Sequence, residues 1–188
     1  MPSDRLQRVF SAIDEANARD PRGYELPYSQ WLTEWVQRLE PNASEELRIV
    51  ARGQHIRRWE IPREKYPADR KGYLLWRETL KGFHAEQVGK IMREAGYPKA
   101  SIEKAARIIL KKNIRDPESQ TIEDALCLVF LERQFADLNK KEPEEKMLEI
   151  LRKSWRKMGE KGRAEALKIS LAEPERTLLQ KALAGGQR

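Results

Sequence analysis

Two histidines and one aspartate are the residues of this sequence best suited to bind a metal ion. His55, His84 and Asp124 fall on three separate predicted helices, and each can face a shared apolar core. His55 follows Leu47 and Ala51 at four-residue spacing, which places these side chains on one helix face. Neutral imidazoles and a carboxylate are a usual ligand set for divalent metals, and converging helices can position them. The pattern predicts a metal site with His55, His84 and Asp124 as ligands.

A structural interpretation of the same residues stays open. A histidine on an apolar helix face is usually a hydrogen-bonded core residue, and no HxxxH or CxxC motif accompanies this pair. Thr121 and Asp124 resemble a capping pair, so Asp124 has a sufficient role in the first turn of a helix. If a metal binds, Glu123 and Asp124 are the candidate catalytic residues. Glu123 would then act as a general base, which requires burial to raise its pKa.

A basic and aromatic segment separates the two histidines. Residues 52–77 carry eight Arg or Lys against three Asp or Glu, which places +5 of the formal net charge of +7 in this stretch. Guanidinium groups bind phosphate through paired hydrogen bonds, and aromatic rings, Trp59 among them, can stack on a base. We therefore predict a phosphate-type anion site here. Its candidate ligand-binding residues are Arg52, Gln54, Arg57, Arg58, Arg63, Tyr66, Arg70, Tyr73, Trp76 and Arg77.

The opposing interpretation is that the charges of this segment pair with one another. Several of its arginines have a glutamate close by in the sequence. Such pairs would tie a loop to the neighbouring helices without binding any ligand. The pairs expected in that case are Arg58, Arg63 and Arg77 with Glu60, Glu64 and Glu78.

The elements that must position these residues are helices. Apolar residues recur at helical spacing in the long segments and no segment alternates with a period of two, so we predict an all-α, HD-like fold. His55 is expected near the end of a helix that Asn42 caps and that runs to about residue 59. His84 is expected within a helix capped by Asp69. Residues 24–27 are expected to form a linker.

Length and composition favour one main domain. A chain of 188 residues can bury a core of its own, and the composition changes after Asn139. We therefore expect residues 1–139 to form the helical core. Residues 140–188 are expected to pack on it or to serve as an interaction arm.

Charge and cysteine content bear on partners and compartment. The sequence pI is about 9.5, which favours anionic partners such as a phosphorylated small molecule, a nucleotide or nucleic acid. The single cysteine, Cys127, excludes an internal disulfide and is typical of a reducing compartment. No apolar run approaches the length of a membrane span, and the first residues lack a signal-peptide pattern. We therefore expect a cytoplasmic protein that does not bind membranes.

Three segments are similar to an uncharacterised family, domain of unknown function 4202. They read HIRRWE at residues 55–60, PREKYPADRKGYLLWR at residues 62–77 and EDALCLVFLE at residues 123–132. The resemblance covers most of the chain. It implies the fold of that family and no activity.

The order of the helices also resembles that of the HD-domain phosphohydrolases, all-α enzymes whose metal ligands lie on separate helices. That resemblance implies that His55 is the histidine of the His-Asp doublet. It implies that His84 is an additional ligand and that Asp124 is the aspartate of the closing helix. The metal would be Mn, Fe, Zn or Mg.

The sequence departs from the HD pattern at three places. Ile56 stands where the doublet aspartate would be, and Tyr28 or Ser29 stands near the position of the first histidine. Lys111 or Lys112 stands where some members have further histidines. The departures imply either a degenerate metal centre or a site that binds an anion through Arg and Lys, with Lys111 among them, where the family would bind a metal.

The leading hypothesis is a protein that binds a phosphorylated ligand, a nucleotide or nucleotide-like metabolite, in a cationic pocket. With a divalent metal it would hydrolyse that ligand as an HD-like phosphohydrolase. One alternative is an RNA-binding module that uses residues 52–77. Another is a non-catalytic helical protein that binds a partner.

Overall fold

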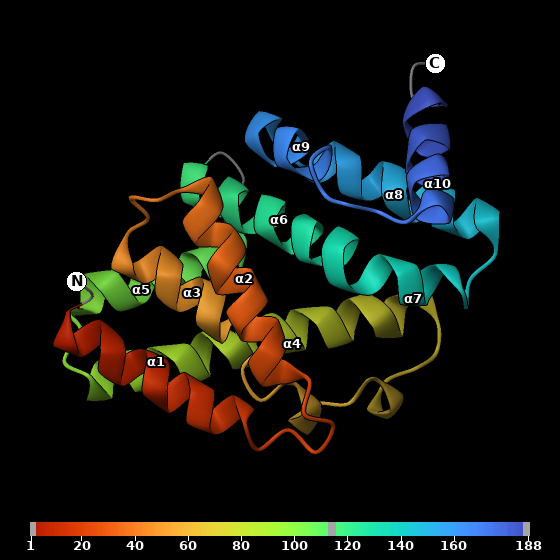
Figure 1. Cartoon of the computed structure of the whole chain (residues 1–188). Coiled ribbons are helices and arrows are strands. Elements are labelled where there is room, and N and C mark those ends of the chain that lie inside the picture. Colours follow the sequence, from red (N-terminus) through yellow and green to blue (C-terminus); the bar gives the residue numbers. More distant parts are fainter. Residues whose placement is uncertain (1–2, 113–115, 186–188) are drawn as a thin grey trace. The chain divides into compact units, whose positions relative to one another are not determined.

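The computed structural model describes residues 3–112 and 116–185, and this part of the chain is built of helices without a strand (Figure 1). The prediction of an all-α fold is confirmed. The α-helices are α1 (Asp4–Asn17), α2 (Glu25–Leu39), α3 (Glu45–Gly53), α4 (Arg70–Glu94), α5 (Lys99–Ile109), α6 (Pro117–Val129), α7 (Phe135–Asn139), α8 (Glu144–Lys157), α9 (Glu160–Ala166) and α10 (Glu173–Ala184). Two short 3-10 helices, η1 (Arg58–Glu60) and η2 (Arg63–Lys65), and one π-helical stretch, η3 (Phe130–Gln134), complete the set.

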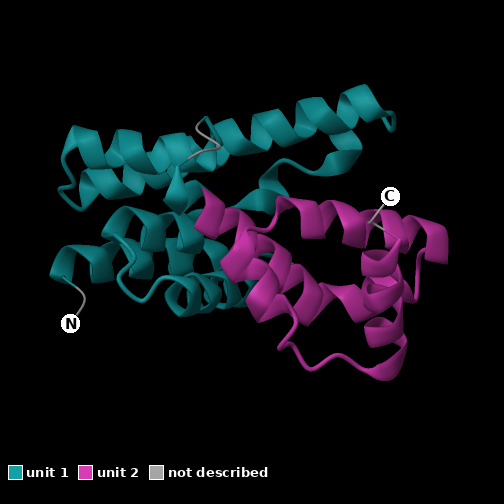
Figure 2. Cartoon of the chain, turned by 90° about the horizontal axis from the view of Figure 1, so that it is seen from above, with its two compact units in different colours: residues 1–119 teal, residues 120–188 magenta. Residues whose placement is uncertain are grey.

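The chain divides into two compact units, residues 1–119 and residues 120–188 (Figure 2). The boundary expected after Asn139 therefore lies inside unit 2. There α7 packs on α10, and the Asn139 side-chain amide donates a hydrogen bond to Glu175 Oε1 at 3.1 Å. The change in sequence composition does not coincide with the change in packing.

Helix α3 is the centre of unit 1, because it packs against α1, α2, α4 and α5. Four of its residues have less than 1% of their surface exposed: Leu47, Ile49, Val50 and Ala51. The charged residues of the helix, Arg48 and Arg52 among them, keep part of their surface exposed, so α3 is amphipathic with a broad apolar face.

The limits of α3 differ from those expected. Ser44 is its N-cap, with the hydroxyl oxygen accepting from the Leu47 N–H at 3.1 Å, so the assignment to Asn42 was wrong. The helix ends at Gly53, because the chain turns there and Arg57 adopts a left-handed conformation with φ of 53°. His55 therefore lies in the turn after the helix and not on a helix face.

Helix α2 begins at Glu25, so the linker expected at residues 24–27 was also wrong. The Asp20 carboxylate accepts hydrogen bonds from the backbone N–H groups of Tyr24 and Glu25 at 2.9 and 3.0 Å. Pro27 falls in the first turn, where a missing N–H does no harm. The result places Glu25 at the buried start of a helix.

Helix α4 is exposed to solvent in its first turns and partly buried in its later turns. Asp69 caps it as predicted, accepting from the Gly72 N–H at 2.7 Å. Its first turns expose Tyr73, Leu74 and Leu75, whereas the later turns bury His84 against the core of unit 1. The helix thus presents a surface at one end and positions a buried histidine at the other.

Unit 2 contains most of α6 and the elements that follow it. Helices α8 and α10 pack against each other, and Met147 and Leu151 of α8 and Leu178 and Ala182 of α10 are buried. Throughout the described residues, no helix combines the length and the apolar composition that crossing a bilayer requires.

Gly53 permits a close approach of α3 and α4. A Cβ added at Gly53 would lie 2.4 Å from Val88 Cγ2, whereas one added at the exposed Gly82 in α4 would meet nothing within 4 Å. We predict that Gly53→Ala lowers the free energy of unfolding of unit 1 by about 1–3 kcal/mol through overpacking. Gly82→Ala should raise it by about 0.5–1 kcal/mol, because alanine is the better helix former.

Urea unfolding of both variants, followed by circular dichroism, would measure the two effects. Gly82→Ala is the matched control, since it makes the same change in the same unit. Equal effects of the same sign would contradict the assigned contact.

Candidate functional site

The histidine pair, His55 and His84, meets inside unit 1. The ring centroids lie 6.0 Å apart with an interplanar angle of 38°. His84 Nδ1 is 2.9 Å from the Ile56 carbonyl oxygen in a buried hydrogen bond. Because a carbonyl only accepts, Nδ1 is the protonated nitrogen of a neutral His84 ring. Its Nε2 is then a buried acceptor, and it has no hydrogen-bond partner among the described residues.

Ile56 lies in the turn after α3, at the position where the resemblance to HD-domain proteins would place an aspartate. Its side chain has no exposed surface and belongs to the core, while its carbonyl oxygen orients His84. A carboxylate in this place would be buried among apolar groups at a high cost. Residue 56 thus serves the fold with its side chain and the histidine pair with its backbone.

Glu25 and Tyr28 complete the surroundings of His55, and neither was predicted to contact this histidine. The Tyr28 ring stacks on the His55 ring with centroids 4.4 Å apart and an angle of 11°. Glu25 Oε2 lies 3.7 Å from His55 Nδ1, and the glutamate is only 1% exposed. The one available signal was Asp20, a helix-capping residue type five positions before Glu25.

Burial changes the protonation of these groups. It raises the pKa of Glu25 to about 7, with the charge of Asp20 adding to the effect and those of Arg58 and Arg22 opposing it. Burial, followed by the positive charge of Arg58, lowers the pKa of His84 to about 4. The imidazole of His84 is therefore neutral near pH 7, whereas Glu25 exchanges its proton in that range.

His55 is surrounded by positive charge. Its pKa is lowered well below the ordinary value by burial first, then by Arg58, His84, Lys111 and Arg77. We call Arg58, Arg77 and Lys111 the cationic cluster. These three residues come from η1, from α4 and from the turn after α5, so the fold gathers charges that are far apart in the sequence.

Two members of the cationic cluster have no polar partner in the part of the chain that the structure describes. In residues 3–112 and 116–185, the guanidinium groups of Arg58 and Arg77 make no ion pair or hydrogen bond. The Arg58 guanidinium lies over the Trp76 ring, with Cζ 4.7 Å from the centroid. The Trp76 indole N–H in turn donates to the Ile61 carbonyl at 2.8 Å. Arg58 is thus held in place by stacking while its donors are unused.

Three other arginines of the basic segment already have partners. Arg52 forms a two-pronged contact with Asp14 at 2.5 and 2.6 Å. Arg57 pairs with Glu60 at 2.6 Å. Arg63 donates to the carbonyls of Tyr66 and Pro67 at 2.9 and 2.7 Å. These groups stabilise the loop between α3 and α4.

The expected pairing of Arg58, Arg63 and Arg77 with glutamates close in sequence was wrong. Within the described residues Glu60 pairs with Arg57 and Glu78 pairs with Lys81. The remaining residues predicted to bind a ligand are placed in different surroundings. Gln54 is buried, Tyr66 is half-buried, and Arg70 and Tyr73 are exposed on the first turn of α4.

Asp124 lies in unit 2 and has a structural role there. Helix α6 begins at Pro117, where Asp116 accepts from the Ser119 N–H at 2.8 Å, so Asp124 is not at the helix start as predicted. Its carboxylate accepts from the backbone N–H groups of Gly159 and Gly162 at 2.7 and 3.2 Å. A Cβ at Gly162 would lie 2.5 Å from Asp124 Cγ, so the two segments fit closely.

The predicted metal ligands make other contacts within the described residues. No three His, Cys, Asp or Glu side chains within residues 3–112 and 116–185 converge closely enough to hold an ion. The Asp124 carboxylate is already bound to backbone N–H groups. Its neighbour Glu123 is half-buried on α6. The metal set of His55, His84 and Asp124 and the catalytic roles of Glu123 and Asp124 stay predictions.

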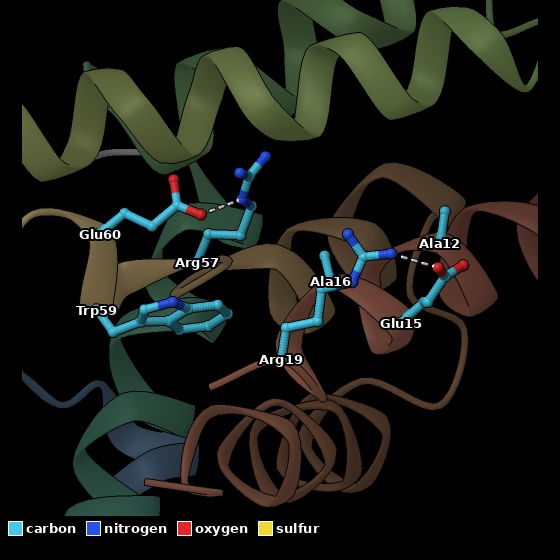
Figure 3. Close-up of a pocket in the computed structure, with 7 residues that line it drawn as sticks. All are labelled: Ala12, Glu15, Ala16, Arg19, Arg57, Trp59 and Glu60. Carbon is cyan, nitrogen blue, oxygen red and sulfur yellow. Dashed lines mark hydrogen bonds and ion pairs between the residues drawn. The ribbon is translucent and has the colours of Figure 1, made fainter. Parts of the chain in front are cut away.

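A cavity lies beside the loop, between α1 and η1 (Figure 3). It has a volume of about 290 Å³, and the Trp59 ring forms one wall next to Arg57 and Arg19. Both arginines are paired, Arg57 with Glu60 and Arg19 with Glu15, each at 2.6 Å. This cavity therefore offers an aromatic wall but no unpaired guanidinium group.

Residues 7–179 match the sequence profile of a family described as Domain of unknown function (DUF4202). The match spans most of the chain, so the protein belongs to this family. No curated protein and no solved structure matches the chain. The resemblance to HD-domain phosphohydrolases stays a prediction.

Glu25→Gln should change how stability depends on pH. The folded pKa of Glu25, about 7, is above its ordinary value of 4.5, so the unfolded chain loses this proton first as the pH rises. The parent therefore loses stability as the pH rises from 4.5 to 7, and a glutamine does not. We expect the free energy of unfolding of the variant to rise relative to the parent by about 2–3 kcal/mol over this window.

Urea unfolding at several pH values would measure the difference. His84 acts in the opposite sense, since its lowered pKa removes stability as the pH falls from 6.5 to about 4, but it is present in both proteins and cancels. The control is Glu34→Gln, an exposed site on the same helix. A constant difference between parent and Glu25→Gln would show that Glu25 has an ordinary pKa.

Proposed function

We propose that this protein binds a phosphate-bearing small molecule at the cationic cluster, beside the histidine pair of unit 1. The observation that supports the proposal most is the state of Arg58 and Arg77. Both guanidinium groups lie near neutral imidazoles and lack a carboxylate partner in the described residues, although other arginines of the segment have one. Guanidinium groups with free donors are the usual protein ligands for phosphate oxygens.

The electrostatic balance of the site favours an anion. Arg58, Arg77 and Lys111 all act on His55 with positive charge. The only carboxylate that approaches this imidazole in the described part of the chain is Glu25, whose pKa of about 7 leaves it partly neutral at neutral pH. A ligand with two or more negative charges would offset the excess.

Preorganisation also supports binding. Arg58 is half-buried and stacked on Trp76, whose indole is fixed by its hydrogen bond to Ile61. An arginine held in this way loses little conformational entropy when it binds. Within the residues that the structure describes, His84 Nε2 and Glu25 Oε2 are buried without hydrogen-bond partners, at a cost of about 1–3 kcal/mol each. A site that accepts such a cost is suited to function more than to stability.

Binding is the part of the function that this geometry supports. Hydrolysis of the ligand with a divalent metal stays a prediction, because no three His, Cys, Asp or Glu side chains of the described residues form a group that could hold the metal. The RNA-binding alternative depends on many exposed cations along residues 52–77. Arg52, Arg57 and Arg63 make internal contacts instead, which leaves a compact site better suited to a small ligand.

Replacing either unpaired arginine should weaken the binding of inorganic tripolyphosphate. Loss of a hydrogen bond to a charged group costs about 1.5–3 kcal/mol, so Arg58→Gln and Arg77→Ala should each raise the Kd about tenfold or more. Isothermal titration calorimetry of the full chain at low salt would measure the affinities. Thermal unfolding of each variant would show whether it is folded.

Lys71→Ala is the matched control, since it removes one positive charge from an exposed position in the same segment. The control should leave the affinity nearly unchanged. If Lys71→Ala weakened binding as much as the other two, diffuse charge and not a defined site would be responsible. Absence of tripolyphosphate binding by the parent protein would refute the proposal.

A further inference from the structure

Tyr73 extends the surface beside Arg77. The two residues are four apart on α4, so they lie on one helix face about one turn of 5.4 Å from each other. Arg77 Cζ is 5.8 Å from the centroid of the Tyr73 ring. Trp76 is on the same face, with its ring centroid 6.0 Å from that of Tyr73. A phosphate bound at Arg77 therefore has an aromatic surface next to it.

Tyr73 is more accessible than the other aromatic residues of the basic segment. It is 42% exposed, whereas Trp59, Tyr66 and Trp76 are only half-exposed. Trp76 is fixed by its indole hydrogen bond and lies under Arg58. Tyr73 is the ring that a group from solvent can reach most easily.

The loop before α4 holds Tyr73 from one side. Arg63 Cζ lies 6.0 Å from the ring centroid, and the Arg63 guanidinium is itself fixed by the carbonyls of Tyr66 and Pro67. Arg63 has used its donors on the backbone, so it supports the ring and does not compete for phosphate. Arg77, on the same helix as Tyr73, has its donors free within the described residues.

We infer that the phosphorylated ligand is a nucleotide whose base stacks on Tyr73 while its phosphates reach Arg77 and Arg58. The inference rests on the proposed function, because it assigns the second half of the ligand whose phosphates that function binds. Stacking suits any base, since each has a flat π-face, and it makes Tyr73 a residue that selects nucleotides over other polyphosphates.

Trp59 is the competing position for the base. It lines the separate cavity between α1 and η1 (Figure 3), next to Arg57 and Arg19. Their partners Glu60 and Glu15 place negative charge at this cavity, which opposes a polyphosphate. The unpaired Arg77 favours Tyr73 for the nucleotide.

The experiment compares adenosine triphosphate with inorganic tripolyphosphate. Both carry a chain of three phosphates, and only the first has a base. Isothermal titration calorimetry of the full chain, with EDTA present, would measure both affinities for the parent and for Tyr73→Ala, Tyr73→Phe and Trp59→Ala. Circular dichroism would confirm that each variant is folded.

We expect the parent to prefer adenosine triphosphate by at least about fivefold. Tyr73→Ala should weaken the nucleotide by about fivefold to a hundredfold and leave tripolyphosphate within about twofold. Tyr73→Phe should restore the preference, because it keeps the ring, and Trp59→Ala should not alter it.

Two failures can be told apart. If tripolyphosphate and the nucleotide bind equally and Tyr73→Ala affects neither, the stacking inference is wrong while anion binding at the cationic cluster stands. If the parent binds neither compound, the proposed function itself is wrong. If Trp59→Ala, and not Tyr73→Ala, abolished the preference for adenosine triphosphate over tripolyphosphate, the base would bind in the cavity beside Trp59 and the inference would be wrong. If a single-stranded RNA displaced the nucleotide and bound more tightly, the inference would also be wrong.

Discussion

The hydrogen bond from His84 to the Ile56 carbonyl is the contact on which the candidate site depends. It joins the turn after α3 to the middle of α4, across 28 positions of sequence. Because the carbonyl can only accept, Nδ1 carries a proton, and burial, which lowers the pKa of His84 to about 4, leaves the other nitrogen of the neutral ring to accept. The bond requires the two helices to lie close, and Gly53 permits this by leaving room for Val88. The packing of two helices therefore decides which nitrogen of a buried histidine carries the proton.

The left-handed conformation of Arg57 directs the side chains of Arg57 and Arg58 to different contacts. A non-glycine residue in this conformation costs about 1–3 kcal/mol, so neighbouring contacts must maintain it. The Asn17 side-chain oxygen accepts from the Arg57 N–H at 3.2 Å, and Arg57 donates to Gln87 at 3.2 Å. The donors of the Arg57 side chain are therefore occupied by contacts within the fold. Arg58, one residue later, stacks on Trp76 and keeps its donors free.

Local sequence signals were sufficient for the all-α fold and for the Asp69 cap, since both depend on neighbouring residues. The site depends on distant ones. Excess charge in residues 52–77 indicated an anion site, but Arg52 is neutralised by Asp14, 38 positions earlier, and no local pattern reveals that pairing. The burial of Glu25 likewise follows from the packing of α2 and α3, not from the residues beside it. Asp124 looked like a helix start because Thr121 precedes it, whereas Asp116 is the residue that accepts at the true first turn.

The charges around the histidine pair also bear on the choice between a metal and an anion. A neutral imidazole is a good metal ligand, and by that measure His55 and His84 qualify. The cationic cluster, which adds to burial in lowering the pKa of His55, would at the same time repel a divalent cation, and Glu25 opposes that repulsion only when it has lost its proton. An aspartate at position 56 would have supplied a fixed negative charge, but Ile56 is part of the core. The positive charge around His55 is therefore better matched by the phosphate group that we propose as ligand than by a metal alone, and a metal would be favoured only together with the negative charge that phosphate brings.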